Sequence, residues 1–292
     1  MESSIAHLID EQQRNIDGFA IGRVLPSRVQ RTVGPFIFFD HIGPAALAPG
    51  HGLDVRPHPH IHLSTVTYLF EGEILHRDSL GCVQSIQPGA INWMTAGRGI
   101  VHSERSPPAE RAAGPKMHGL QLWVASPESH EDIAPSFSHH AEGELPALTF
   151  AGGHGKLLAG SAYGLVAPVP VQSPLCYIEL HLEAGARVEL PDLHERGLYL
   201  LSGELEVDHQ RLGPQKLAVL TPGATPNIVA TQPTHLMILG GEPIGERYIF
   251  WNFVSSKKEA IVEATRAWKA GEFPRVPDEH DFIPLEAEPH FA

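Results

Sequence analysis

The sequence predicts an all-β fold of two tandem β-barrels with a short C-terminal helix. Turn-forming residues are frequent, with 28 glycines and 26 prolines among 292 residues, which is typical of short strands joined by tight turns. Runs of β-branched and aromatic residues lie between these turns. Residues 198–204 and 221–223 also repeat the outline of residues 67–73 and 87–89, as the duplication of one barrel would leave them.

The first half contains the clearest strand patterns. Residues 34–40 form an apolar run opened by a Gly-Pro turn, and residues 64–70 are β-branched and aromatic. Both segments are predicted as strands. Further strands are expected at 74–78, 90–94 and 118–125, with turns rich in Gly, Asp and Pro between them.

Between the two halves, the apolar period fades over residues 126–147, where polar and charged residues dominate. This change favours a linker, with room for a short helix within it. We therefore predict an N-terminal barrel domain at residues 1–134 and a C-terminal barrel domain at residues 135–292.

One helix is predicted close to the C-terminus, at about residues 256–270. Ser256 and Glu259 fit a capping box at its start. Gly271 and then Pro274 would end it. We expect this helix to pack against a barrel.

Charge and cysteine content limit the classes of partner and compartment. The net charge of −13, from 34 acidic and 21 basic residues, disfavours non-specific contact with nucleic acid or an anionic membrane, while a protein partner stays open. Cys82 and Cys176 lie far apart and outside any CxxC pair, so two free thiols in the cytoplasm are expected, with one disulfide as the alternative. Neither a signal-peptide pattern nor an apolar run of ~18 residues is found in the sequence.

Two pairs of residues form the candidate metal site. His58 and His60 are separated by one residue, as are His102 and Glu104. On a strand, side chains at i and i+2 share a face, so two strands could direct three imidazoles and one carboxylate at one point. Imidazole and carboxylate suit a divalent first-row transition metal.

The same pairs have a simpler explanation, because 19 histidines occur in this chain and such residues are often exposed or hydrogen-bonded in a core. Three features favour ligands. A strongly β sequence follows His60, and a glycine-rich bend at 95–99 precedes His102. The hairpins between the two pairs would also make the strands that carry them neighbours in one barrel.

These residues lie within strings that resemble the pirin family of the cupin superfamily. The resemblance covers nearly the whole chain, and the string at 93–104 is the most specific. The strings that carry it are residues 34–40, 58–73, 76–81, 93–104, 118–124, 241–243 and 251–255.

The resemblance implies a bicupin, with two jelly-roll-like cupin barrels in tandem and one metal in the first. It further implies that His58, His60, His102 and Glu104 hold iron as Fe(II), although this ligand set also accepts other divalent transition metals. The general cupin motif places a Glu shortly after its His pair. Here that position is Ser64, so the carboxylate ligand would be Glu104.

His62 departs from the pirin pattern, in which Gly is frequent at this position. On a regular strand, His62 would share the face of His58 and His60. It would then be a second-shell donor, a substrate contact or an extra ligand. Alternatively, strand twist would leave it lining the mouth of the cavity, which is the interpretation we favour.

The second barrel is expected to be structural, because its positions equivalent to His58 and His60 are Glu189 and Pro191. His235 stands alone in the sequence, and a degenerate second metal site is the alternative. In the first barrel, His76 and Asp78 are assigned to a hairpin turn.

Three functions are compatible with these features. Pirin-like proteins include quercetin 2,3-dioxygenases, which open a flavonol ring with O₂. By that resemblance, Glu104 would be both a metal ligand and the general base that accepts the proton of the substrate hydroxyl. Other pirins are nuclear co-regulators, which implies an iron-dependent, redox-sensing protein that binds a protein partner without turnover. The third hypothesis is a structural bicupin with an adventitious metal.

Overall fold

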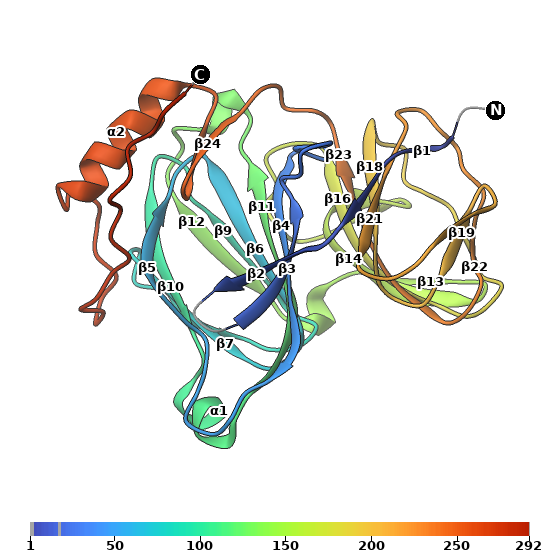
Figure 1. The fold of residues 1–292 in the computed structure, drawn as a ribbon, viewed down its shortest axis with the longest axis horizontal. Helices are drawn as coiled ribbons and strands as arrows, with labels where there is room; N and C mark the ends of the chain where they lie inside the picture. Colours follow the sequence, from blue (N-terminus) through green and yellow to red (C-terminus); the bar gives the residue numbers. More distant parts are fainter. Residues whose placement is uncertain (1–2, 17–18, 292) are drawn as a thin grey trace. The chain divides into compact units, whose positions relative to one another are not determined.

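The computed structural model describes residues 3–16 and 19–291, and it confirms the predicted all-β class (Figure 1). The chain forms two compact units. We call residues 15–21, 41–139 and 244–292 the N-terminal barrel, and residues 1–14, 22–40 and 140–243 the C-terminal barrel. Among the described residues, none of the helices is long and apolar enough to span a membrane.

Two sheets and a hairpin form the N-terminal barrel. Its long sheet has the order β12 (Ser136–His140), β9 (Ile91–Thr95), β6 (Leu63–Glu71), β11 (Lys116–Ala125), β4 (Phe36–Ala46), β3 (Phe19–Leu25) and β2 (Gln12–Ile16). The strands β4, β3 and β2 each have residues in both units. Its short sheet has the order β5 (Asp54–His60), β10 (Ile100–Arg105), β7 (Ile74–Asp78) and β8 (Val83–Ile86). Apolar side chains from both sheets, including Leu69 of β6 and Ile74 of β7, meet in one buried cluster.

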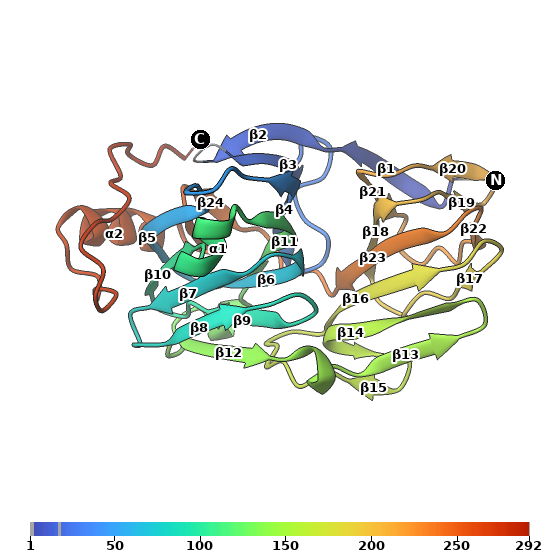
Figure 2. The same cartoon turned by 90° about the horizontal axis from the view of Figure 1, so that it is seen from below.

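Two sheets also enclose the core of the C-terminal barrel (Figure 2). The long sheet has the order β1 (Ile5–Asp10), β21 (Lys216–Leu220), β18 (Glu195–Ser202), β23 (Thr234–Gly241), β16 (Leu175–Leu182), β14 (Gly153–Ala162) and β13 (Ala147–Phe150), and β15 (Leu165–Val166) pairs with β14. The short sheet has the order β17 (Arg187–Val188), β22 (Ile228–Ala230), β19 (Leu205–Val207) and β20 (Gln210–Leu212). Alternate side chains of both sheets fill the space between them.

The compact units do not follow the predicted division at residues 134 and 135. The N-terminal strand β1 pairs with β21 and so belongs to the C-terminal barrel. Conversely, the C-terminal residues 244–292 belong to the N-terminal barrel. The sequence places boundaries where local composition changes, whereas strand pairing is free to bring distant segments together.

Most of the predicted strands are confirmed, with shifted ends. The segment predicted at 34–40 extends as β4 to Ala46, and those at 64–70, 74–78, 90–94 and 118–125 correspond to β6, β7, β9 and β11. The predicted linker is wrong in part. It contains the 3₁₀ turns η1 (Glu128–His130) and η2 (Glu142–Glu144), and also β12, which pairs with β9 at the sheet edge.

The C-terminal helix is confirmed as α2 (Lys258–Lys269). A short helix, α1 (Pro108–Ala113), was not predicted. Ile261 and Ala264 of α2 are buried against Ile61 and Phe253, so the helix covers the end of β5 together with the hairpin β24 (Tyr248–Phe250) and β25 (Phe253–Ser255) (Figure 1).

The predicted capping box of this helix does not form. Lys257 occupies the N-cap position, without a side-chain cap. The hydroxyl and backbone N–H of Ser256 instead donate to the buried carboxylate of Glu131, at 2.9 and 2.7 Å. Glu131, 125 residues away along the chain, is therefore the partner of Ser256 in place of Glu259.

Candidate metal centre

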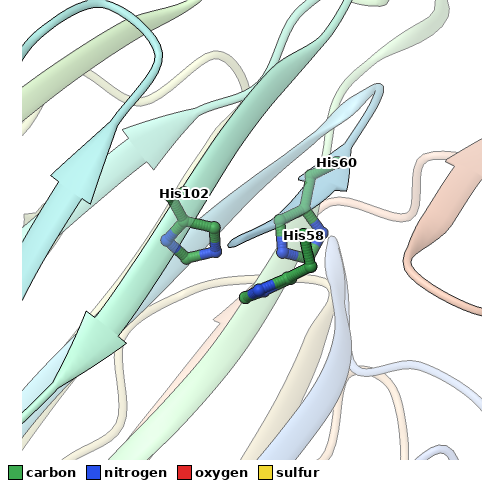
Figure 3. Close-up of side chains that lie close together, drawn as sticks. All are labelled: His58, His60 and His102. Carbon is green, nitrogen blue, oxygen red and sulfur yellow. The ribbon is translucent and has the colours of Figure 1, made fainter. Parts of the chain in front are cut away.

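The two predicted pairs lie on neighbouring strands of the N-terminal barrel. His58 and His60 end β5, His102 lies within β10, and these strands pair antiparallel with His102 opposite His58. The i, i+2 spacing on β5 places both imidazoles on one face. The three side chains point toward one another (Figure 3), and we call them the imidazole triad.

The triad is compact and closed to solvent. Its ring centroids are 4.4 Å apart for His58 and His102, 4.9 Å for His58 and His60, and 5.1 Å for His60 and His102. One nitrogen from each ring lies within 4.8 Å of the other two. The residues are between 1% and 6% exposed.

Backbone carbonyls orient two members of the triad. Nδ1 of His58 donates to the carbonyl of Arg56 at 2.9 Å, and Nδ1 of His60 donates to the carbonyl of Asn252 at 3.0 Å. A carbonyl only accepts, so both Nδ1 atoms carry the proton and both Nε2 atoms keep a free lone pair. This is the arrangement that metal-binding histidines commonly show.

His102 provides the test of whether a metal fits here. Both of its ring nitrogens are buried without a hydrogen-bond partner among the described residues. A buried polar group without a partner costs free energy, and an ion between the rings would remove that cost. The three imidazoles therefore fit a divalent transition metal.

Burial keeps the triad neutral when no metal is bound. It lowers the pKa of His58 to about 4, and the hydrogen bond to Arg56 opposes this shift only in part. Burial also places the pKa values of His60 and His102 well below the ordinary value, and the neighbouring imidazoles lower them further. Neutral imidazole is the form that binds metal.

Glu104 lies in the same barrel but outside this compact group. A register shift falls between His102 and Glu104. The ligand atoms of the triad lie within 4.8 Å of one another, and among the described residues Glu104 does not belong to this group. The Thr67 hydroxyl lies 3.1 Å from Oε1 of Glu104 and 2.9 Å from Oε1 of Gln121, and it can donate its one proton to either oxygen. Burial raises the pKa of this carboxyl, while the neighbouring His76 and the Thr67 hydrogen bond lower it.

His62 lies between two strands and not on the regular strand that the prediction assumed. Its φ of 58° turns the chain between β5 and β6. Its Nδ1 lies 3.4 Å from the carboxylate of Glu131, and its Nε2 lies 3.6 Å from that of Asp132. Burial lowers its pKa, and these two carboxylates oppose the shift. These two carboxylates follow the η1 turn. The second-shell role and the cavity-mouth position of His62 both stay predictions.

The glycine-rich bend before His102 is a tight turn. Gly97 has a φ of 49°, and a side chain there would collide with the carbonyl of Ile133. The Gly97 carbonyl accepts a hydrogen bond from the His62 N–H at 2.9 Å. The bend thus connects β9 to β10 tightly and directs His102 toward β5.

Two neighbours of the triad were not predicted as site residues. His76 lies opposite Glu104 across β7 and β10, stacks on Phe137 at 4.3 Å, and is 5.4 Å from the His102 ring. Its Nε2 lies 3.0 Å from the carboxylate of Asp78, which also accepts two backbone N–H groups of the following turn. The turn role predicted for Asp78 is confirmed, whereas His76 also borders the site.

The other neighbour is Asn252, whose carbonyl holds His60 from 192 residues away. The string 251–255 was noted only as a family signature. Within it, Trp251 has a φ of 53° in the turn between β24 and β25. His76 and Asp78 are separated by one residue on a predicted strand, and this spacing could have indicated His76 as a neighbour of the site. Nothing in the sequence alone indicates that the backbone carbonyl of Asn252 is a partner of His60.

A two-sheet barrel that directs imidazoles inward from adjacent strands defines the metal-binding class of cupins. Comparison with known proteins makes the assignment specific. A family model of pirin matches residues 18–124, and a model of the pirin C-terminal cupin domain matches residues 177–274. The chain belongs to the pirin family and is a bicupin.

Relatives and solved structures agree with this assignment. A pirin-like protein of Caulobacter vibrioides is 49% identical over 95% of this chain and 98% of its own length. Pirin of Homo sapiens is 32% identical over 82% of this chain and 85% of its own length. A crystal structure of a quercetin 2,3-dioxygenase from Acinetobacter baumannii is 33% identical and has a TM-score of 0.87, covering 98% of this chain and 95% of that chain.

Proposed function

We propose that this pirin is a non-haem Fe(II) dioxygenase that opens a flavonol such as quercetin with O₂. The observation that carries the proposal is the buried imidazole triad, in which one nitrogen of each ring lies within 4.8 Å of the other two. The likeness to a solved quercetin 2,3-dioxygenase, at a TM-score of 0.87, supports the choice of substrate. We also propose a cytoplasmic location, supported by two free thiols at Cys82 and Cys176.

In this proposal, His58, His60, His102 and Glu104 are the ligands. The carbonyls of Arg56 and Asn252 keep two of the imidazoles in the Nδ1–H form. When bound, a divalent ion supplies Lewis-acid chemistry that lowers the pKa of a hydroxyl it contacts. The low exposure of the triad excludes water, which strengthens the electrostatic interactions at the site.

Glu104 is proposed both as the fourth ligand and as the general base. Burial raises the pKa of its carboxyl, and a carboxylate with a raised pKa accepts a proton more readily. Oε1 or Oε2 would take the proton of the substrate hydroxyl. The Thr67 hydroxyl, 3.1 Å from Oε1, would hold the carboxylate in one orientation while it does so.

Aerobic turnover tests this proposal. Iron-loaded protein is expected to consume quercetin and O₂ in equal amounts, and His58→Ala is expected to do neither. Glu104→Gln keeps the shape and an acceptor for Thr67 but removes the base, so kcat is expected to fall by about 10²–10⁴-fold. The iron content of this variant, measured in parallel, separates loss of the base from loss of a ligand. The absence of quercetin consumption with any loaded divalent metal would refute the dioxygenase.

A second candidate is an iron-dependent, redox-sensing protein that binds a protein partner without turnover. The near-complete burial of the triad, at 1–6% exposure, favours it, because a flavonol would need an opening to reach the ion. The net charge of −13 suits a basic protein partner better than DNA. Retention of a partner that changes with the redox state of the iron, in protein without quercetinase activity, would favour this candidate.

A further inference from the structure

The C-terminal barrel carries a second group of metal-ligand side chains on the outer face of its long sheet. In β16, Ile178, Leu180 and Leu182 point into the barrel core. Strand alternation therefore places Glu179 and His181 on the opposite face. On the neighbouring strand β23, His235 lies directly opposite His181. His235 thus does not stand alone, as the sequence suggested.

The three side chains, which we call the outer cluster, are close enough to share one ion. Nε2 of His235 lies 2.8 Å from Oε1 of Glu179, and Nε2 of His181 lies 3.4 Å from the same oxygen. The imidazoles of His181 and His235 stack at 4.2 Å. One ligand atom from each residue lies within 4.8 Å of the other two, as in the imidazole triad.

We propose that the outer cluster binds a divalent transition-metal ion of the Zn²⁺, Ni²⁺ or Cu²⁺ class. Two imidazoles and one carboxylate are a ligand set that zinc accepts at distances of ~2.0–2.2 Å, with a further position left for water. Small rotations of the three side chains would bring their atoms to such an ion.

Exposure and charge around the outer cluster suit an ion that exchanges with solvent. The side chain of His181 is 45% exposed, whereas those of Glu179 and His235 are 7% and 16% exposed. On the neighbouring strand β14, Lys156 lies opposite Glu179 but pairs its amine with Glu142. His154 lies opposite His181 on the same strand, and their imidazoles stack at 5.2 Å. A bound ion would link β16 to β23, because each strand supplies an imidazole.

Zinc binding to the full chain tests the proposal. The background is the His58→Ala/His102→Ala double variant, which disables the triad. Equilibrium dialysis is expected to find two Zn²⁺ per wild-type chain and one per background chain. Adding His235→Ala to the background is expected to weaken the remaining site by more than the roughly 10–100-fold that loss of an outer-shell partner costs. Co²⁺ absorption bands of the background variant should disappear with the same substitution.

His194→Ala is the matched control, because His194 is an exposed histidine in the same barrel but outside the cluster; it should leave zinc binding unchanged. If the background variant does not fold by circular dichroism, His181→Ala/His235→Ala in the wild-type chain should reduce two ions to one. Zinc binding that His235→Ala does not alter, or a folded background chain that binds no zinc, would overturn the proposal. A failed triad would give a different result, namely one ion that only His235→Ala removes.

Discussion

The interiors of the two barrels differ on the same scaffold. In the C-terminal barrel, side chains from both sheets, such as Ile178 and Leu205, meet in an apolar core. The N-terminal barrel also has an apolar cluster, but its strands β5 and β10 in addition direct three imidazoles toward one another. The cupin architecture therefore does not itself specify a metal site. A few inward positions decide whether the barrel is filled by packing or by ligands.

This difference has an energetic counterpart. Aliphatic side chains gain free energy when they are buried, whereas a buried imidazole needs hydrogen-bond partners. The carbonyls of Arg56 and Asn252 supply them for His58 and His60. His102 has no such partner among the residues that the structure describes, so it depends most on an ion.

Removal of His102 should therefore have the largest effect on the N-terminal barrel. We expect His102→Ala to abolish iron binding at the triad, because the remaining imidazoles both come from β5 and no longer surround the ion. Elemental analysis of iron-loaded protein measures this. Both proteins should be compared in the His235→Ala background, so that metal bound at the proposed outer site does not add to the total. Full iron content in His102→Ala would contradict the site.

Truncation of a core side chain in the C-terminal barrel should lower the free energy of unfolding without changing the iron content. Leu200 is fully buried in its core, and Leu200→Ala is expected to lower the free energy of unfolding by about 2–5 kcal/mol through lost burial and a residual cavity. Urea denaturation checks this value. Iron content of the folded protein should stay at the wild-type level, and a parallel loss of iron would show that the two barrels are not independent.

A smaller effect is expected from the hydroxyl beside Glu104. Thr67→Val keeps the shape of the side chain but removes the hydroxyl that can donate to Oε1 of Glu104 or of Gln121. We expect iron affinity to fall by about 10–100-fold, the usual cost of losing an outer-shell partner. Competition with a chelator measures the affinity. Thr65→Val, on the same strand and also buried, is a suitable control.

The same comparison explains how far the sequence could predict the structure. The spacing of His58 with His60, the bend at Gly97 and the β pattern after His62 are local, so the paired strands and the triad were predictable. The position of His62 was not, because a single positive φ removes it from the strand face. The sequence also could not show that Asn252 or His235 has neighbours far away along the chain, since only strand pairing brings these segments together.

The last expected effect concerns pH and the metal-free protein. Burial lowers the pKa of His58 from 6.5 to about 4, so between these values the unfolded chain binds more protons than the folded one. The free energy of unfolding should then fall as pH decreases from 6.5 toward 4, with a slope from His58 approaching ~1.4 kcal/mol per pH unit. Above pH 6.5 this contribution is constant.

Urea denaturation in the presence of a chelator, between pH 4.5 and 7.5, tests this linkage. Other groups titrate in the same range, so the slope should be compared with that of His58→Asn, whose amide can still donate to the Arg56 carbonyl. We expect the variant to be less steep, because one buried imidazole has been removed. Equal slopes would show that His58 does not change its proton affinity on folding. The triad would then be more solvated than its 1–6% exposure indicates, and the contrast with the apolar C-terminal core would be weaker.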